Sequence, residues 1–376
     1  MEIVDTYIEL LKSAIWNHES LTDIHSDEVP KIVQLAASQG TGPLVYDQLL
    51  KRKEVAVPAA LRMQMKQQCL YSMMQQNTMM SILGKAWAAF ENAGIHPVLL
   101  KGFALAYYYP QPHLRQWGDI DLYVGQKQYH DACAVLRDAF PEAKHPIEEF
   151  EFLKHYNFVF GDTLLEMHRV SMTFAHPRDR KYYEQLEEQY LTKDGPQVEL
   201  DGVTITVPND TFNVFFTFLH AWHHFMETGM NMKQVCDIAV LLHAKHDTMN
   251  SALLKEMLTK LHLMEPWQLV VYIIVQYLGV ARDKIPFYTE GCNERAELLF
   301  KRIIKEGSSR IQESTKAEGV SYLKRKWITF LSRMADSRMV KLYAPHYARH
   351  LAKGNILHGI ERTFKGSKTA YNVECV

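Results

Sequence analysis

The sequence predicts an α+β protein in which a small α/β unit with a mixed sheet lies between two helical regions. Near the N-terminus, apolar residues recur at three- and four-residue spacing, which is typical of amphipathic helices. Short apolar or alternating segments then predict strands, and the helical spacing returns from about residue 208. The expected organisation is an N-terminal helical region over 1–93, an α/β core over 94–207, a helical C-terminal domain over 208–364 and a loose tail over 365–376.

The overall composition is that of an ordinary water-soluble globular protein. Of 376 residues, 47% are hydrophobic and 23% are charged, and the net charge of -1 favours no class of partner. The charge is unevenly distributed, because residues 301–376 hold 16 basic and 6 acidic side chains. Contact with nucleic acid or another polyanion would explain this basic segment, and so would a solvated helical face paired with the acidic remainder of the chain.

Cysteine usage and hydropathy exclude several classes of protein. The five cysteines are scattered without a CxxC pair, which argues against a structural zinc site and a disulfide framework. The first residues lack the basic and apolar regions of a signal peptide. No stretch approaches the roughly 18 to 20 uninterrupted apolar residues of a membrane helix. We therefore expect a cytoplasmic protein without membrane contact.

The helical regions are predicted from apolar periodicity and from the residues that end helices. A first helix follows Ile3 to Ile15, and a second runs from Pro58 to Ala93, with Pro at its first turn and Asn-Ala-Gly at its end. Asn209 or Asp210 is a suitable N-cap for a helix that begins the C-terminal region. The further helices predicted there are Lys233–His243, Ala252–Leu261, Pro266–Leu278, Glu294–Ile304 and Gly319–Met334.

The α/β unit is predicted from shorter patterns. A strand at Pro97–Leu100 precedes Lys101-Gly102 and a short helix through Tyr109, which Pro110 ends. Alternating polar and apolar residues, or short apolar runs between turn residues, predict the remaining elements. These are a strand at Gly118–Val124, a helix at Gln128–Phe140, a hairpin of Tyr156–Phe160 and Thr163–His168 around Gly161-Asp162, and a strand at Val203–Val207.

Three carboxylates in this unit are candidates for a metal site. Asp119 and Asp121 lie two residues apart on a predicted strand, so both project from one face. Two carboxylates so close repel each other unless a cation such as Mg²⁺ lies between them. If the strand Thr163–His168 runs antiparallel beside them, Glu166 reaches the same ions. The alternatives are a solvated strand end for the aspartates and an exposed hairpin position for Glu166.

The motifs L-L-K-G, R-x-x-G-D-I-D-L-x-V and E-x-H occur in this order between residues 99 and 168. Together they resemble the uncharacterised bacterial nucleotidyltransferase family within the DNA polymerase beta-type superfamily, strongly over residues 94–170. The resemblance implies a minimal nucleotidyltransferase core with Asp119, Asp121 and Glu166 as catalytic metal ligands. It also implies transfer of a nucleoside monophosphate from a nucleoside triphosphate to a hydroxyl, with release of pyrophosphate. Two Mg²⁺ ions, or Mn²⁺, would be the cofactor, and the acceptor would be a small molecule, a protein or RNA.

One departure from the superfamily affects the expected phosphate contacts. Lys101 and Gly102 occupy the place of the Gly-Ser phosphate loop, so no serine hydroxyl follows. The lysine charge and the Gly102 amide are expected to compensate, unless Lys101 is a surface lysine. The missing serine also keeps open an alternative function, a catalytically reduced nucleotide-binding or regulatory module of the same fold.

Other candidate nucleotide-binding or phosphate-binding residues are Arg115, Gly118, His168 and Lys233. Their alternatives are a structural ion pair for Arg115, a hydrogen-bonded structural histidine for His168 and a surface position for Lys233. His220 and His224 lie one turn apart on a predicted helix and have the spacing to share a cation, but no H-E-x-x-H motif contains them.

Overall fold

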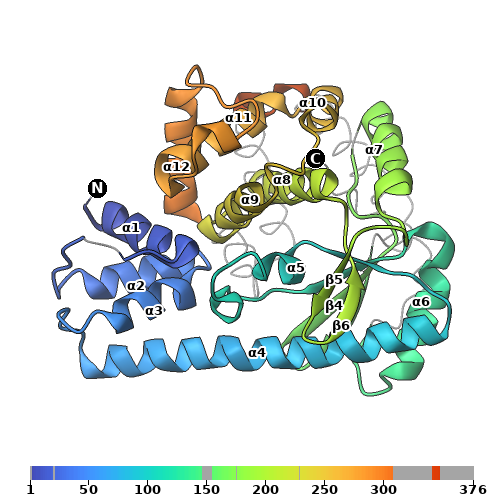
Figure 1. Ribbon diagram of the computed structural model, residues 1–376, viewed down its shortest axis with the longest axis horizontal. Helices are drawn as coiled ribbons and strands as arrows, with labels where there is room; N and C mark the ends of the chain where they lie inside the picture. Colours follow the sequence, from blue (N-terminus) through green and yellow to red (C-terminus); the bar gives the residue numbers. More distant parts are fainter. Residues whose placement is uncertain are drawn as a thin grey trace, which may run out of the picture.

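The structure, a computed structural model, describes residues 2–19, 22–145, 155–174, 176–227, 229–307 and 341–347. It confirms the α+β class. The long helix α4 (Ala59–Asn92) extends along the base of the molecule, from the N-terminal helices at one end to the sheet at the other (Figure 1). In the same view, the helices that follow residue 209 lie on the side of the molecule opposite to α4.

The main sheet is mixed and has four strands in the order β1-β2-β4-β3. Strand β2 (Ile120–Tyr123) pairs antiparallel with β1 (Val98–Leu100) and parallel with β4 (Thr163–His168). Strand β3 (His155–Phe160) forms the edge and pairs antiparallel with β4, which confirms the predicted hairpin. The sheet therefore carries the D-x-D and E-x-H motifs on its two central strands.

The expected antiparallel pairing of the Asp and Glu strands is wrong. After β2 the chain forms α6 (Gly125–Ala139), and the following hairpin places β3 at the edge of the sheet, antiparallel to β4. The turn at Gly161-Asp162 reverses the chain once more, so β4 enters beside β2 in the same direction. A helix between two parallel strands is the usual crossover connection.

Apolar residues on one face of the sheet form a core with α4 and α6. Ile120 and Leu122 are completely buried, as the alternation in their strand predicts. The residues that surround them include Leu83, Trp87 and Phe90 of α4, Tyr129, Cys133 and Leu136 of α6, and Leu165 and Met167 of β4. Because alternate residues of a strand point to opposite faces, Asp121 and Glu166 lie on the other face.

Between β1 and β2 the chain forms the short helix α5 (Gly102–Ala106) and a 3-10 turn, η1 (Pro112–Leu114). Helix α5 ends three residues before the predicted end at Tyr109. Lys101 immediately precedes α5 and has a φ of 35°, in the left-handed region that non-glycine residues seldom adopt. Such backbone conformations cost roughly 1–3 kcal/mol and are common at functional sites.

The region after the main sheet contains elements that the sequence analysis does not predict. Helix α7 (Pro177–Tyr190) is strongly polar, and β5 (Gln197–Leu200) has four residues of which only Leu200 is buried, so both segments give weak signals. The predicted strand at 203–207 is observed as β6 (Val203–Thr206). It pairs antiparallel with β5 in a separate two-stranded sheet, not with the main sheet.

Within the described part of 210–307, five helices follow, and all five agree with predicted segments. They are α8 (Asp210–Glu227), α9 (Met232–Lys245), α10 (Ser251–Lys260), α11 (Met264–Leu278) and α12 (Asn293–Glu306), with a 3-10 turn η3 (Arg282–Lys284) before the last. The Asn209 side chain caps α8, because its Oδ1 accepts a hydrogen bond from the Phe212 amide at 2.9 Å. The predicted helix at Gly319–Met334 and the tail at 365–376 lie outside the described residues.

Helices α1 (Glu2–Trp16), α2 (Val29–Ser38) and α3 (Gly42–Lys51) share their main core with the C-terminal helices. The Trp16 indole donates to the Leu278 carbonyl at 2.6 Å. Gln39 joins three segments, since its Nε2 donates to the Ile303 carbonyl and its Oε1 accepts from the Met232 amide, each at 3.0 Å. These contacts fix the first turn of α9 against the N-terminal helices and α12.

Within the described ranges, we find no helix that combines the length and the apolar character needed to cross a membrane.

A buried ion pair joins the segment before β2 to α9. Both Nε and Nη2 of Arg115 lie 2.7 Å from the Asp237 carboxylate oxygens, and the Tyr109 hydroxyl donates to Asp237 Oδ1 at 2.8 Å. The Arg115 and Asp237 side chains are only 4% and 6% exposed. A bidentate pair removed from water in this way fixes the two segments relative to each other.

Asp237→Ala is expected to lower the free energy of unfolding by about 3–5 kcal/mol, because it leaves the buried guanidinium of Arg115 without a counter-charge. Urea denaturation measures the change. The control is Lys51→Met, which removes an ion pair with Asp47 in which the lysine side chain is 54% exposed. That variant should lose at most about 1 kcal/mol. Similar losses in the two variants would contradict the structural importance of the buried pair.

Candidate functional site

The three predicted carboxylates converge at one end of the central strands. Asp121 on β2 lies directly opposite Glu166 on β4, and Asp119 immediately precedes β2. One oxygen from each of the three lies within 4.8 Å of the others. Residues directly opposite each other point to the same face of the sheet in both parallel and antiparallel pairs. Asp121 and Glu166 therefore meet as predicted, although the predicted direction of the Glu166 strand was wrong.

Positive groups surround the buried Asp121 carboxylate. Lys101 Nζ lies 3.1 Å from Asp121 Oδ1, and His168 Nε2 donates to the same oxygen at 2.8 Å. His168 Nε2 is also 3.3 Å from Glu166 Oε2, and His155 Nε2 is 3.5 Å from Glu166 Oε1. The carboxylates thus lie within a network of cationic or hydrogen-bonding neighbours.

These neighbours change the protonation equilibria of the cluster. Burial would lower the pKa of Lys101, but the carboxylates, Asp121 first, raise it above its ordinary value. Burial likewise opposes ionisation of His168, while its bonds to Asp121 and Glu166 raise its pKa. For Glu166, burial alone would raise the pKa, yet the bond to His168 and the nearby positive charges lower it. The charged form of each group is therefore favoured.

The carboxylate cluster is chemically suited to a hard divalent cation. Its ligand atoms are all carboxylate oxygens, which Mg²⁺ and Mn²⁺ prefer. Asp121 Oδ2 is buried and accepts no hydrogen bond from the described residues, although an ionised oxygen in such a position normally has a partner. The residues present therefore fit the metal site that the motif implies.

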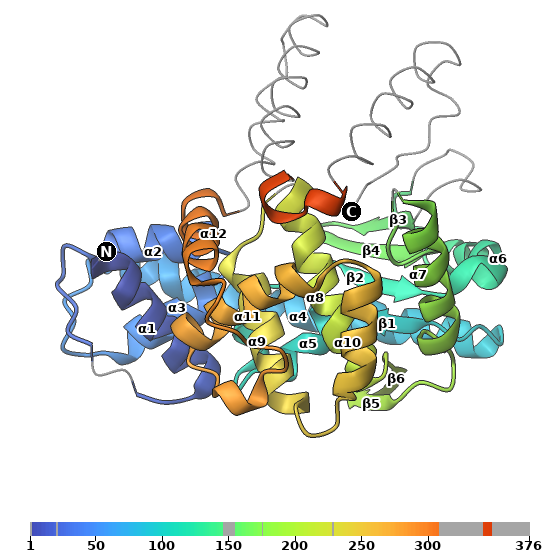
Figure 2. The same cartoon turned by 90° about the horizontal axis from the view of Figure 1, so that it is seen from above.

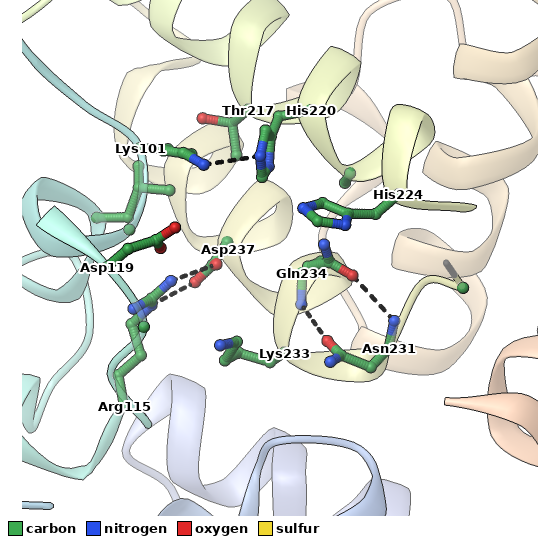
Figure 3. Close-up of a pocket in the computed structure, with 15 residues that line it drawn as sticks. Lys101, Arg115, Asp119, Thr217, His220, His224, Asn231, Lys233, Gln234 and Asp237 are labelled. Carbon is green, nitrogen blue, oxygen red and sulfur yellow. Dashed lines mark hydrogen bonds and ion pairs between the residues drawn. The ribbon is translucent and has the colours of Figure 1, made fainter. Parts of the chain in front are cut away.

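A pocket of about 240 Å³ adjoins the cluster (Figure 3). The segment from Lys101 to Asp119 forms one wall, and α8 and α9 form the wall that faces it. Six of the predicted site residues line the pocket, namely Lys101, Gly102, Arg115, Gly118, Asp119 and Lys233. Asp121, Glu166 and His168 do not line it, and Asp119 is the carboxylate shared by the cluster and the pocket wall.

The structure favours the structural interpretation of Arg115. Two of its nitrogens are engaged with Asp237, and its Nη1 approaches the Gln116 carbonyl at 3.5 Å. Its guanidinium still contributes positive charge to the pocket that it lines.

Lys233 lies in the first turn of α9 and lines the same pocket. It forms no ion pair with the residues that the structure describes, in contrast to Lys101 and Arg115. Burial, followed by the positive charge of Arg115, lowers the pKa of Lys233 to about 8. The Lys233 residue is half-buried and lines the pocket wall.

The face of α8 that borders the pocket includes residues that sequence reasoning did not assign to it. His220 Nε2 accepts a hydrogen bond from Lys101 Nζ at 2.7 Å. Its ring packs edge-on against His224 at 4.4 Å between centroids, and burial, followed by the charge of Lys101, lowers the pKa of His224 to about 3. Within the described ranges, neither histidine belongs to a group of three or more potential metal ligands, and both line the pocket.

Thr217, His220 and His224 lie at spacings of three and four residues along α8, among mostly apolar neighbours. That pattern is visible in the sequence and marks a polar stripe on α8. Asn231, Gln234 and Asp237 line the pocket from α9 and its N-cap. Their positions in the sequence do not indicate a pocket, because a capping box and a single aspartate are common in helices of any function.

Comparison with known proteins agrees with the motifs. The profile of the family described as "Uncharacterised nucleotidyltransferase" matches residues 25–279, which include the carboxylate cluster and both walls of the pocket. No curated protein matches the chain, and no solved structure does so. Because the family profile covers more than half of the sequence, the chain belongs to this uncharacterised nucleotidyltransferase family.

Proposed function

We propose that the protein transfers a nucleoside monophosphate from a nucleoside triphosphate to a hydroxyl group, in a reaction that depends on Mg²⁺ and releases pyrophosphate. One observation carries the proposal: three carboxylates meet within 4.8 Å at the edge of a pocket lined by two lysines. This arrangement combines ligands for hard cations with positive charge for a polyphosphate.

Asp119, Asp121 and Glu166 would hold the cation or cations. When bound, such ions lower the pKa of an attacking hydroxyl and stabilise negative charge on the departing pyrophosphate. The Lys101 and Lys233 side chains, on facing walls of the pocket, would bind the phosphates and orient them toward the carboxylates. His168 holds Asp121 and Glu166 in position through its bonds to both.

A catalytically reduced binding module is the alternative function. It is favoured by the position of Lys101, whose ammonium group already neutralises Asp121 Oδ1 where a cation would otherwise be expected. It is opposed by the complete carboxylate set and by the free Asp121 Oδ2. The two functions differ in turnover and not in nucleotide binding, so one experiment separates them.

The acceptor is a further part of the proposal. A small-molecule alcohol, a protein side chain and an RNA 3′ end all present the required hydroxyl. The basic segment over 301–376 slightly favours a polyanionic acceptor, and most of it lies outside the described residues.

Asp121→Asn is expected to reduce metal-dependent transfer at least about 100-fold, since bound cations contribute several kcal/mol of transition-state stabilisation and each ~1.4 kcal/mol is a factor of ten. The assay incubates the protein with each of the four α-labelled triphosphates, with and without Mg²⁺. Pyrophosphate release and label transfer to the protein or to added RNA are measured. The matched control is Asp138→Asn, which changes an exposed aspartate of α6 and should retain full activity.

The possible results distinguish the two functions. Mg²⁺-dependent transfer that is lost only in Asp121→Asn supports the nucleotidyltransferase. Metal-dependent nucleotide binding with no transfer from any of the four triphosphates supports the reduced module. Absence of nucleotide binding would contradict both proposals.

Affinity for a nucleoside triphosphate is expected to fall as the pH rises through about 8. The pKa of Lys233 is lowered to about 8, so this side chain is charged below that pH and neutral above it. Phosphate groups complete their own ionisation near pH 6 to 7 and do not produce the change. Equilibrium binding with a fluorescent triphosphate analogue between pH 6.5 and 9.5 measures the profile.

Two substitutions test the assignment to Lys233. Lys233→Met should weaken binding roughly 10- to 100-fold below pH 8 and flatten the profile, because a charged hydrogen bond contributes about 1.5–3 kcal/mol. Lys233→Arg should retain binding up to pH 9.5, and Lys255→Met at an exposed position of α10 should behave as the wild type. An unchanged profile in Lys233→Met would show that this lysine does not bind the phosphates.

A further inference from the structure

A second group of potential metal ligands lies at the start of α7, among residues that the proposed function does not use. His176 is the N-cap residue of α7, and Asp179 lies in its first turn. His346 comes from the described C-terminal segment 341–347, drawn in red in Figure 2. One ligand atom from each of these residues lies within 4.8 Å of the other two.

The contacts within this group centre on the carboxylate. His176 Nδ1 lies 3.2 Å from Asp179 Oδ1, and His346 Nε2 lies 3.5 Å from Asp179 Oδ2. These separations are close to the roughly 3.3 Å between neighbouring ligands that lie about 2.0 Å from a tetrahedral ion. The His262 ring stacks on His346 with 3.6 Å between centroids, so a third imidazole adjoins the group.

Asp179 is a buried carboxylate whose ion-pair contacts among the described residues are with two histidines. Its residue is 5% exposed, and no lysine or arginine of the described residues forms an ion pair with it. Its Oδ2 lies beside His346 Nε2 and the Tyr347 hydroxyl, and that hydroxyl donates to the Leu261 carbonyl at 2.5 Å, so no hydrogen bond of normal geometry reaches Oδ2 from the described residues. The position of Asp179 in the first turn of α7 supplies only a modest favourable dipole. A buried carboxylate in such a position normally has a cation as partner.

We propose that His176, Asp179 and His346 bind a zinc ion, with His262 or a water molecule as the fourth ligand. Two imidazole nitrogens and one carboxylate suit Zn²⁺ and disfavour Mg²⁺ and Ca²⁺, which prefer oxygen ligands alone. The ion would fasten the segment 341–347 to α7 and to the turn after α10. Its role is structural, and the proposal does not depend on the nucleotidyl transfer reaction.

Another group with two imidazoles, His155, Glu166 and His168, serves as an internal comparison. There, His168 is bound to Asp121, and Glu166 is shared with the carboxylate cluster. A zinc measurement must therefore distinguish these two places in the same protein.

The experiment uses the untagged full chain, stripped with a chelator and dialysed against Zn²⁺ at micromolar concentration. Bound metal is counted by elemental analysis for the wild type, His346→Ala, Asp179→Asn and His155→Ala. We expect His346→Ala and Asp179→Asn each to lose one equivalent of zinc relative to the wild type, and His155→Ala to retain that equivalent. Asp179→Asn keeps the shape of the side chain, so it remains informative if His346→Ala folds poorly.

Hydrogen exchange provides an independent readout. Zinc should slow amide exchange in 341–347 at least about tenfold in the wild type and leave it unchanged in Asp179→Asn, while Mg²⁺ should have no effect there. The proposal would be overturned if the wild-type protein binds no zinc. It would also be overturned if His346→Ala and Asp179→Asn both retain the bound zinc.

Discussion

Asp121 and Glu166 face each other across the parallel strands β2 and β4, where water has little access to Asp121. Two neighbouring carboxylates in a protein interior repel each other, and each requires a positive or hydrogen-bonding partner. Lys101 and His168 meet that requirement from opposite directions along the chain. Lys101 also forms a hydrogen bond with His220, so the lysine that neutralises Asp121 connects the strands to α8. The unusual backbone conformation of Lys101 is consistent with a side chain held in place by these contacts.

The second wall of the pocket depends on a similar arrangement. The pair of Arg115 and Asp237 joins the segment before β2 to α9, and Gln39 holds the first turn of α9 from the N-terminal side. Lys233 projects from that same turn without a carboxylate partner among the described residues. The pocket therefore contains two paired cationic groups and one half-buried lysine available to an anionic ligand, which is the distribution of charge expected around a polyphosphate.

Much of this arrangement was predictable because its signals are local. The alternation of polar and apolar residues predicts the strands at Gly118–Val124 and Thr163–His168 and places Asp121 and Glu166 on one face. The motifs on these strands indicate the family. The direction of β4 was not predictable, since period-two alternation is the same in parallel and antiparallel strands. Partners distant along the chain were also missed, because Arg115 and Asp237 are 122 positions apart and Lys101 and His220 are 119 apart. Nothing near either residue in sequence specifies such a partner.

The shared core of α1, α2 and α3 with the C-terminal helices has a consequence for how the chain folds during synthesis. The first helices leave the ribosome early, yet the surfaces that cover them, including Leu278 and Ile303, are made more than 200 residues later. Until then α1, α2 and α3 can pack only on one another and on α4, and contacts of such long sequence separation form slowly. The α/β core, whose strands and helices are close in sequence, has its own separate cluster of buried residues. The N-terminal helices therefore complete their core only after the C-terminal helices have been synthesised.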